Sequence, residues 1–288
     1  MDDVKTIQQV RDAVAAARKQ GKSVGFVPTM GALHAGHGSL IETCRSECGF
    51  VIVSIFVNPA QFGPGEDLAE YPRTIEADSE YCKNLDVDLL FAPDVEEMYP
   101  QDNFTWVDVE KITDGLCGPF RQSHFRGVAT VCAKLFNIVC PDIAYFGQKD
   151  AQQAVVIRKM VADLNFPLQI RLCPTIREPD GLAASSRNRY LSPQQRSDAL
   201  CLYRALKVCS DLVRGGNLEC GRLVEAMYKV IRRSPLASPE YITIVHPDTL
   251  APLKRIQSRA IAALAVRIGN TRLIDNLLID LNNPQTMI

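Results

Sequence analysis

Residues 25–40 read G-F-V-P-T-M-G-A-L-H-A-G-H-G-S-L, and this stretch decides the expected fold. The apolar run at residues 24–27 predicts a buried strand, which Pro28 should end because proline has no N–H for a β-ladder. Glycines then loosen the backbone, and an apolar-periodic segment from Gly38 to about Cys48 predicts a helix. A glycine-rich turn between a strand and a helix N-terminus is typical of a phosphate site, because free N–H groups face the ligand.

Two of the four histidines in the chain, His34 and His37, lie in the tetrad H-A-G-H of this turn. Histidines beside a glycine at a helix start have no evident packing role, so we expect them to donate hydrogen bonds to a bound anion. A metal site is the alternative interpretation. It is the weaker one, because Glu42 is the nearest acidic residue and lies inside the helix.

Further apolar runs extend this unit into a parallel sheet. Residues 50–57, F-V-I-V-S-I-F-V, are continuously apolar, which is typical of a strand buried on both faces. Strands and helices then alternate along the chain, so the sequence predicts a doubly wound, Rossmann-like α/β sheet. The other expected strands are 87–91, 105–109, 143–146 and 168–173, and the expected helices are 7–17, 74–84, 128–139 and 151–163.

A second strand–turn–helix unit carries the tetrad Gly147-Gln148-Lys149-Asp150. Lys149 would lie at the same sheet edge as the first turn, where open α/β sheets bind ligands. A solvated surface lysine is the common alternative. A polar loop follows at residues 175–190 and contains Ser185-Ser186-Arg187, and we expect it to close over a nucleotide held between the two turns.

The pattern changes near Ser192-Pro193, an N-cap followed by proline at the first helical position. Long amphipathic helices come next, followed by expected strands at 241–245, 260–266 and 273–279. We therefore predict two domains, residues 1–180 and a smaller α+β domain at residues 181–288.

Composition limits the classes of function. The chain of 288 residues has a net charge of −1 and a pI near 6.4, which argues against a nucleic-acid partner. No apolar run approaches the ~20 residues of a membrane span, and the acidic start Met1-Asp2-Asp3 does not suggest a signal peptide. The ten cysteines form no C-x-x-C pair. We read them as small buried hydrophobic residues in a reducing cytoplasm.

Seven motifs, taken together and in order, resemble the pantothenate synthetase (pantoate–β-alanine ligase) family. They are P-T-M-G-A-L-H-A-G-H (28–37), V-S-I-F-V-N-P-A-Q-F (53–62), Y-P-R-T (71–74), H-F-R-G-V (124–128), F-G-Q-K-D-A-Q-Q (146–153), D-G-L-A-A-S-S-R-N-R-Y-L (180–191) and R-L-I-D-N (272–276). The resemblance runs nearly from end to end, whereas H-x-G-H alone occurs across the nucleotidylyltransferase superfamily.

The resemblance implies a homodimer whose small C-terminal domain acts as a lid. It implies two chemical steps: the pantoate carboxylate attacks the α-phosphorus of Mg-ATP to give pantoyl adenylate and pyrophosphate, and the β-alanine amine then displaces AMP. The obstacle in the first step is repulsion between negative charges. Catalysis should therefore consist mainly of positioning and charge neutralisation, with magnesium supplying most of the positive charge.

The resemblance also assigns roles by position. His37 would be the catalytic histidine, assisted by His34, Lys149 and Arg187, and Asp78 matches an acidic position near magnesium. Gln61 and Gln153 would hold pantoate, and neutral amides suit a carboxylate that must stay nucleophilic. Pro28 and Thr29 would line the same substrate site. The expected ATP contacts are Met30, Gly31, Ala32, Leu33, His34, Ala35, Gly36, His37, Gly147, Gln148, Lys149, Asp150, Ile176, Ala184, Ser185, Ser186 and Arg187.

Three positions depart from the family pattern: Cys117 and Gln148 stand where glutamate is frequent, and Gln122 stands where proline is frequent. Three alternative functions remain at this point. An adenylyltransferase acting on a phosphorylated acceptor would need a second cationic pocket. An RNA-binding relative of class I synthetases would need a basic surface and a domain large enough to bind an anticodon, and a nucleotide sensor would not need both histidines and Lys149.

Overall fold

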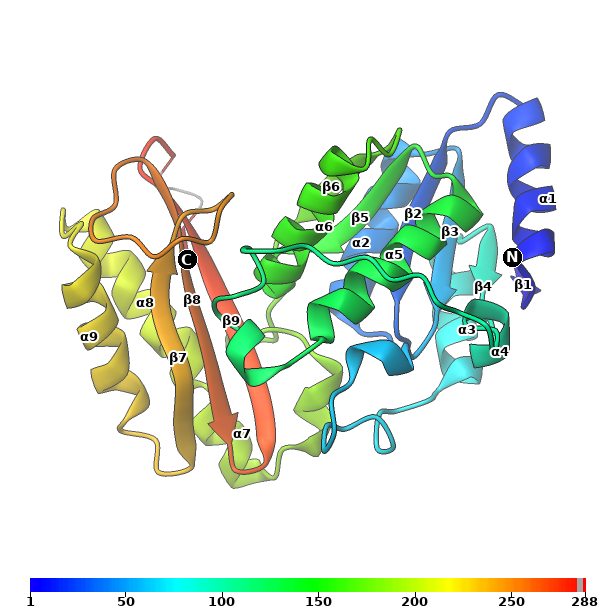
Figure 1. Ribbon diagram of the computed structural model, residues 1–288. Coiled ribbons are helices and arrows are strands. Elements are labelled where there is room, and N and C mark those ends of the chain that lie inside the picture. The colour runs from blue at the N-terminus through cyan, green and yellow to red at the C-terminus, as the bar shows by residue number, and fades with distance from the viewer. Residues whose placement is uncertain (284–286) are drawn as a thin grey trace.

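The computed structural model describes residues 1–283 and 287–288 and contains a six-stranded sheet in which all neighbouring strands are parallel (Figure 1). The strand order is β1-β4-β3-β2-β5-β6. This confirms the expected doubly wound sheet. The strands are β1 (Asp2–Val4), β2 (Val24–Thr29), β3 (Phe50–Ile55), β4 (Leu89–Phe91), β5 (Ile143–Gly147) and β6 (Gln169–Cys173).

Helices cover both faces of this sheet, as continuously apolar strands require. Helices α1 (Ile7–Lys19), α5 (His124–Val139) and α6 (Ala151–Asp163) pack on one face, where Phe26 and Ile52 point. Helices α2 (Ala35–Glu47) and α3 (Ile75–Asn84) pack on the other face, where Val27 and Val53 point. A short helix, α4 (Val95–Met98), follows β4.

The C-terminal part forms a separate antiparallel sheet of β7 (Ala237–Val245), β8 (Arg259–Ile268) and β9 (Thr271–Asp280). Helices α8 (Cys201–Arg214) and α9 (Cys220–Ile231) cover one face of it, after the short α7 (Pro193–Ala199). Its other face packs Ile261 and Ala263 against Ala151 and Val155 of α6. The C-terminal sheet therefore lies beside the N-terminal end of α6, next to the turn that carries Lys149 (Figure 1).

The predicted division at residues 180/181 falls in the loop between β6 and α7. Leu182 packs in the C-terminal core, whereas residues 184–187 line the cavity described below. The boundary between domains stays a prediction.

Pro28 does not end β2, contrary to expectation. The strand continues to Thr29 and keeps its register with β3, with Pro28 opposite Ser54. On the other side, pairing with β5 stops at Phe26, so beyond that point β2 is an edge strand on this side and needs no N–H from residue 28. Strands β2 and β5 therefore separate before Pro28.

Two further details of the fold differ from the prediction. Residues 105–109 do not form a strand, because the Val107 N–H donates to the Thr130 Oγ1 of α5 (2.9 Å) and not to a neighbouring strand. The short edge strand β1 was not expected, since three residues beginning Asp-Asp carry no apolar pattern.

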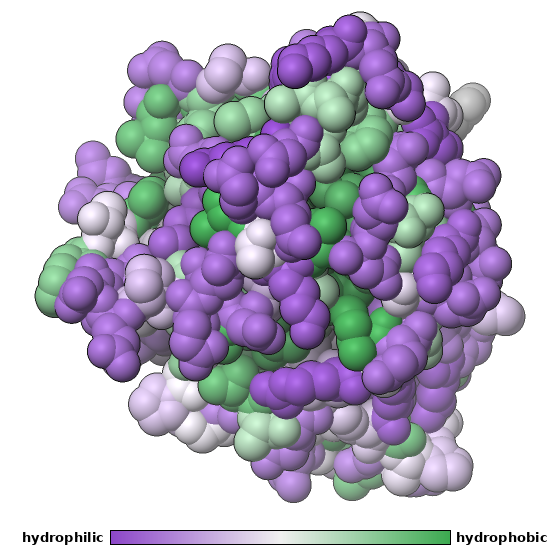
Figure 2. Space-filling model, turned by 90° about the vertical axis from the view of Figure 1, so that its right-hand side faces the viewer, coloured by the Kyte–Doolittle hydropathy of each residue, from purple (hydrophilic) through white to green (hydrophobic). Residues whose placement is uncertain are grey.

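The cysteines agree with the prediction: all ten are free, and Cys140 is the exposed one. In the described part of the chain, no helix has the length and hydropathy needed to cross a membrane. On the side that carries α1 and α4, hydrophilic side chains cover most of the surface and hydrophobic ones show between them (Figure 2). Such a surface is expected where amphipathic helices pack on a sheet and expose their polar sides to solvent.

Candidate active site

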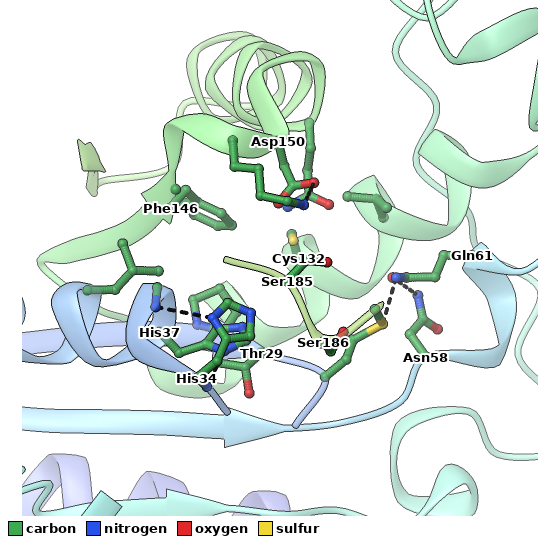
Figure 3. A pocket seen from close by; sticks show the side chains of 18 of the residues that line it. Thr29, His34, His37, Asn58, Gln61, Cys132, Phe146, Asp150, Ser185 and Ser186 are labelled. Carbon is green, nitrogen blue, oxygen red and sulfur yellow. Dashed lines mark hydrogen bonds and ion pairs between the residues drawn. The ribbon is translucent and has the colours of Figure 1, made fainter. Parts of the chain in front are cut away.

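A cavity of about 220 Å³ opens at the carboxyl ends of β2 and β5 (Figure 3). The chain runs from β2 to β3 and β4 on one side and continues with β5 and β6 on the other, so the strand order reverses here. Ligands of open α/β sheets bind at such a switch point. The early end of β2–β5 pairing at Phe26 leaves room for the cavity between the strands.

The cavity brings together most of the residues that the sequence singles out. Those that line it are Pro28, Thr29, Met30, His34, Gly36, His37, Gln61, Gly147, Lys149, Asp150, Gln153, Ile176, Ala184, Ser185, Ser186 and Arg187. Six expected site residues do not line it: Gly31, Ala32, Leu33, Ala35, Asp78 and Gln148. Of these six, Gly31, Ala32, Leu33 and Asp78 are buried, whereas Ala35 is exposed and Gln148 is half-buried.

The two histidines cap the helix that they begin. Helix α2 starts at Ala35, three residues earlier than expected, because His34 is its N-cap. His34 Nδ1 accepts from the Gly36 N–H (3.1 Å), and His37 Nδ1 accepts from the His34 N–H (3.3 Å). Since each Nδ1 is an acceptor, each neutral ring carries its proton on Nε2. The rings lie side by side, with centroids 4.1 Å apart, at the cavity wall (Figure 3).

Both rings are neutral at physiological pH. Burial, with a smaller contribution from the charge of Lys149, lowers the pKa of His34 to about 4. Burial, together with the neighbouring His34 and Lys149, lowers the pKa of His37 to about 3. The pair therefore offers Nε2–H donors with no net charge, and Lys149 supplies the cation.

A third cavity histidine, His124, has its pKa lowered to about 4 by burial and by Arg121. All three rings have folded-state pKa values below the ordinary value near 6.5, so between pH 6.5 and about 4 the unfolded chain binds protons that the folded chain does not. We therefore expect the free energy of unfolding to fall with decreasing pH in this window, by up to ~1.4 kcal/mol per pH unit for each ring. Urea denaturation at pH values of about 7.5, 6 and 5 measures this.

The matched control for this pH dependence is His37→Asn. In this variant the unfolding free energy should fall less steeply with decreasing pH, because the contribution of one of the three rings is gone. Equal unfolding free energies at the highest and lowest of these pH values would contradict the assignment of neutral buried rings.

Asp78, the residue expected near magnesium, does not line the cavity. Its side chain is 3% exposed, and its two carboxylate oxygens accept from the N–H groups of Ala32 and Leu33, each at 2.8 Å. Gly31 and Ala32 have left-handed backbones (φ 82° and 52°), which are costly for a non-glycine residue. Asp78 thus holds the strained turn before His34, and both its oxygens are already in use.

The predicted pantoate ligands differ in how they are held. Gln61 is 7% exposed, and its Oε1 accepts from Asn58 Nδ2 (3.1 Å) while its Nε2 donates to Met30 Sδ. Its backbone oxygen accepts from His124 Nδ1 (2.7 Å). The side-chain amide of Gln153 has no hydrogen-bond partner among the described residues, so it is free for a ligand at the cavity wall.

Two arginines at the mouth of the cavity are held by the loop at residues 62–70. Arg187 makes a two-point ion pair with Asp67 (2.9 and 2.8 Å). Arg121 makes one with Glu66 (2.8 and 2.6 Å). These ion pairs connect the Ser185–Arg187 segment to the loop at residues 62–70. An anion that binds the Arg187 guanidinium must therefore compete with Asp67.

The sequence did not identify three polar groups that shape the cavity: Asn58, His124 and Arg121. Arg121 Nη1 donates to His124 Nε2 (2.9 Å), which fixes the His124 proton on Nδ1 and directs it to the Gln61 backbone. Asn58 and His124 lie in two motifs quoted above, V-N-P-A-Q and H-F-R-G. Their place in these motifs was the sequence feature that could have identified them as site residues.

The departures from the family pattern lie outside the main cavity. Cys117 lines a smaller neighbouring cavity of about 50 Å³ between the two sheets. Its Sγ lies 3.2 Å from Tyr241 Oη and 3.4 Å from Arg272 Nη2. Gln122 is exposed at the surface. Gln148 donates to Asn276 Oδ1 of β9 (2.9 Å).

The wall of the cavity thus divides into two regions. Imidazole N–H groups, a lysine and an arginine line one region, which suits a polyanion such as a triphosphate. Val128, Val131, Cys132 and Leu135 of α5 and Phe146 line another, close to the neutral amide of Gln61. That combination suits a small acid with an apolar, branched carbon skeleton.

Comparison with known proteins gives a family match over nearly the whole chain. Residues 2–278 match the family described as pantoate-beta-alanine ligase. The chain is 55% identical to the pantothenate synthetase of Moorella thermoacetica over 98% of its own length and all of the relative's. It is 51% identical to that of Heliobacterium modesticaldum over 96% of its length and all of the relative's.

Solved structures give the same result. The pantothenate synthetase of Thermus thermophilus superposes with a TM-score of 0.92 at 48% identity, covering 96% of this chain and 99% of that one. The pantoate–β-alanine ligase of Francisella tularensis, solved in complex with β-γ ATP and β-alanine, gives 0.79 at 37% identity, covering 96% and 97%. The chain belongs to the pantoate–β-alanine ligase family.

Proposed function

We propose that this protein condenses pantoate with β-alanine at the expense of ATP, releasing pantothenate, AMP and pyrophosphate. The observation that carries the proposal is one cavity lined by the two neutral histidines that cap α2, by Lys149, and by Gln61 and Gln153. The family match over residues 2–278 and the ATP and β-alanine complex of the Francisella relative support it.

In the first step, a pantoate carboxylate oxygen attacks the α-phosphorus of ATP, and the bond from phosphorus to the bridging oxygen of pyrophosphate breaks. The Nε2–H groups of His34 and His37 donate hydrogen bonds to the phosphate oxygens, while the ammonium of Lys149 and the guanidinium of Arg187 offset their negative charge. The two imidazoles are fixed before the substrate arrives, since their Nδ1 atoms already accept from backbone N–H groups. Preorganised donors of this kind lower the barrier without reorganisation.

In the second step, the amine of β-alanine attacks the acyl carbon of pantoyl adenylate, and AMP leaves. The adenylate is prone to hydrolysis, so water must be kept out. We propose that the polar loop 175–190 and the loop 62–70 close the opening together. The ion pair between Arg187 and Asp67 is the contact that supports this role.

Magnesium, in this proposal, enters with ATP as part of the substrate. No group of three or more histidine, cysteine or acidic side chains among the described residues could hold a metal by itself. Mg²⁺ commonly takes its ligands from substrate phosphates, waters and one or two carboxylates. Asp150 is the carboxylate at the cavity wall beside Lys149, whereas Asp78 is committed to backbone N–H groups.

We further propose that the protein is a homodimer of the cytoplasm. Ten free cysteines suit a compartment that keeps thiols reduced. The extended segment around Trp106 supports self-association, because Phe104 and Trp106 are 85% and 41% exposed there. Light scattering after size exclusion should give twice the mass of one chain.

The overall reaction is tested by incubating the purified protein with ATP, magnesium, pantoate and β-alanine. Mass spectrometry should find pantothenate and AMP in equal amounts. Formation of ADP and phosphate would contradict adenylation and favour an acyl phosphate route.

Removal of either glutamine amide should weaken pantoate binding selectively. Gln61→Ala and Gln153→Ala should raise the KM for pantoate by about 10- to 100-fold, because each leaves a polar substrate group without its partner. The KM for ATP should change far less, since the expected ATP contacts are the histidine turn and the turn of Lys149, and neither includes these amides. Initial-rate kinetics with each substrate varied in turn measures both constants, and equal rises in the two would place the glutamines elsewhere.

A further inference from the structure

The motif R-L-I-D-N at residues 272–276 forms part of β9 and has no role in the chemistry described so far. Its last two residues are polar but buried: Asp275 is 2% exposed and Asn276 is 5% exposed. Buried polar side chains need hydrogen-bond partners. Their partners lie outside the C-terminal sheet, in the two segments that carry the predicted phosphate-binding residues.

The Asn276 amide is fully used on the turn at residues 148–150. Its Nδ2 donates to the backbone oxygens of Gln148 (2.9 Å) and Lys149 (2.8 Å). Its Oδ1 accepts from the Gln148 side chain (2.9 Å). One side chain of the C-terminal sheet thus holds two successive peptide groups of the turn between β5 and α6.

Lys149 extends from this turn toward the main cavity. Its side chain is 20% exposed, its Nζ lies 3.7 Å from Asp150 Oδ1, and it lines both the main and the smaller cavity. No other hydrogen bond or ion pair of the Lys149 side chain occurs in the part of the chain that the structure describes. The position of its ammonium therefore depends mainly on the geometry of its own backbone.

The preceding residue, Asp275, holds the second segment. Asp275 forms a two-point ion pair with Arg177 (2.6 and 3.1 Å), and Arg177 also donates to the Gly181 oxygen (3.1 Å). Asp275 Oδ1 also accepts from the backbone N–H of Asn276 (2.8 Å), so the Asp275 carboxylate holds the backbone that carries the Asn276 side chain. Through these contacts β9 touches both the Lys149 turn and the loop that leads to Arg187.

We propose that Asn276 is a positioning residue for Lys149, through which the C-terminal sheet sets the place of the lysine ammonium in the phosphate site. The proposal rests on the phosphate role of Lys149 given above. Without Asn276, two adjacent carbonyl oxygens lose their donors and the turn can relax. A displacement of about 1 Å at a reacting group can cost roughly 100-fold in rate.

The test compares Asn276→Ala with Asp248→Ala. Asp248 pairs with Arg158 of α6 (2.8 Å), so the control also removes a link between α6 and the C-terminal part, but without touching the turn. Asn276→Ala should lower kcat/KM for ATP by about 10- to 100-fold, and Asp248→Ala should stay within about 2-fold. Asn276→Ser, which keeps one hydroxyl donor, should lie between; it carries the comparison if the alanine variant does not fold.

A second measurement separates positioning from a general loss of stability. In a Lys149→Ala background, Asn276→Ala should lower kcat/KM for ATP by less than about 3-fold, because the group that it positions is gone. The full loss in both backgrounds would overturn the proposal, and so would normal kinetics of Asn276→Ala beside an impaired Lys149→Ala. If Lys149→Ala itself had wild-type kinetics, the phosphate role assigned to Lys149 would be wrong, which is a distinguishable result.

Discussion

Replacing His37 by alanine should lower turnover by about 100- to 1,000-fold, corresponding to the loss of one preorganised donor worth about 3 kcal/mol in the transition state. The neutral ring holds the backbone of His34 through Nδ1, which leaves Nε2–H as its donor toward the phosphates. The two ring nitrogens thus have separate tasks. Steady-state kinetics measures the effect, with circular dichroism as the check on folding.

Two substitutions separate those tasks. In His37→Asn, the amide can still accept from the His34 N–H but lacks a donor at the position of Nε2. In His37→Gln, the amide reaches the position of Nε2 but leaves the N–H of His34 without its cap, which costs about 1 kcal/mol of stability. We expect the asparagine variant to be as inactive as alanine and the glutamine variant to keep more activity. The opposite order would show that helix capping, and not hydrogen bonding to substrate, is the main task of His37.

The second large effect is expected for Lys149→Ala. The side chain is the cation that lies near both neutral histidines, since its charge contributes to lowering the pKa of each. Its removal should lower kcat/KM for ATP by about 100- to 1,000-fold, because the attacking carboxylate and the triphosphate are both anionic. Initial rates with ATP varied at saturating pantoate measure this.

Two control variants accompany this experiment. Lys149→Arg keeps the charge with a different shape, and it should recover only part of the loss because a planar guanidinium does not replace a compact ammonium. Lys159→Ala, on the helix that follows but half-exposed and paired with Asp163, should behave as wild type. Comparable losses for Lys149→Ala and Lys159→Ala would point to a general electrostatic effect and against a specific site.

Much of this fold follows from local sequence patterns. The continuous apolar runs identified β3 and β5, since strands buried on both faces have no polar side. The helix expected at residues 151–163 is α6 with the same bounds, because its apolar period begins directly after a polar turn. Pro28 misled the prediction of β2, because whether a strand tolerates proline depends on pairing with a partner distant in the sequence.

The site was predictable where chemistry lies in consecutive residues and not where it depends on contacts between distant ones. The hydrogen-bond donors of the site are visible in the motifs H-A-G-H and G-Q-K-D themselves, and both motifs contribute side chains to the cavity wall. The task of His124 appears only when the fold brings its ring to the Gln61 oxygen, 63 residues away. In the same way, the burial of Asp78 behind the turn depends on N–H groups 45 and 46 residues away.

The central claim, that a pantoyl adenylate forms before β-alanine takes part, is tested most directly by isotope exchange. The pantoate carboxylate is already ionised at neutral pH, so the first step needs no proton transfer and no amine. The enzyme should therefore exchange labelled pyrophosphate into ATP when magnesium and pantoate are present and β-alanine is absent, and exchange should stop when pantoate is left out. Exchange that required β-alanine would contradict the two-step order, and exchange with ATP alone would indicate a covalent adenylyl-enzyme in its place.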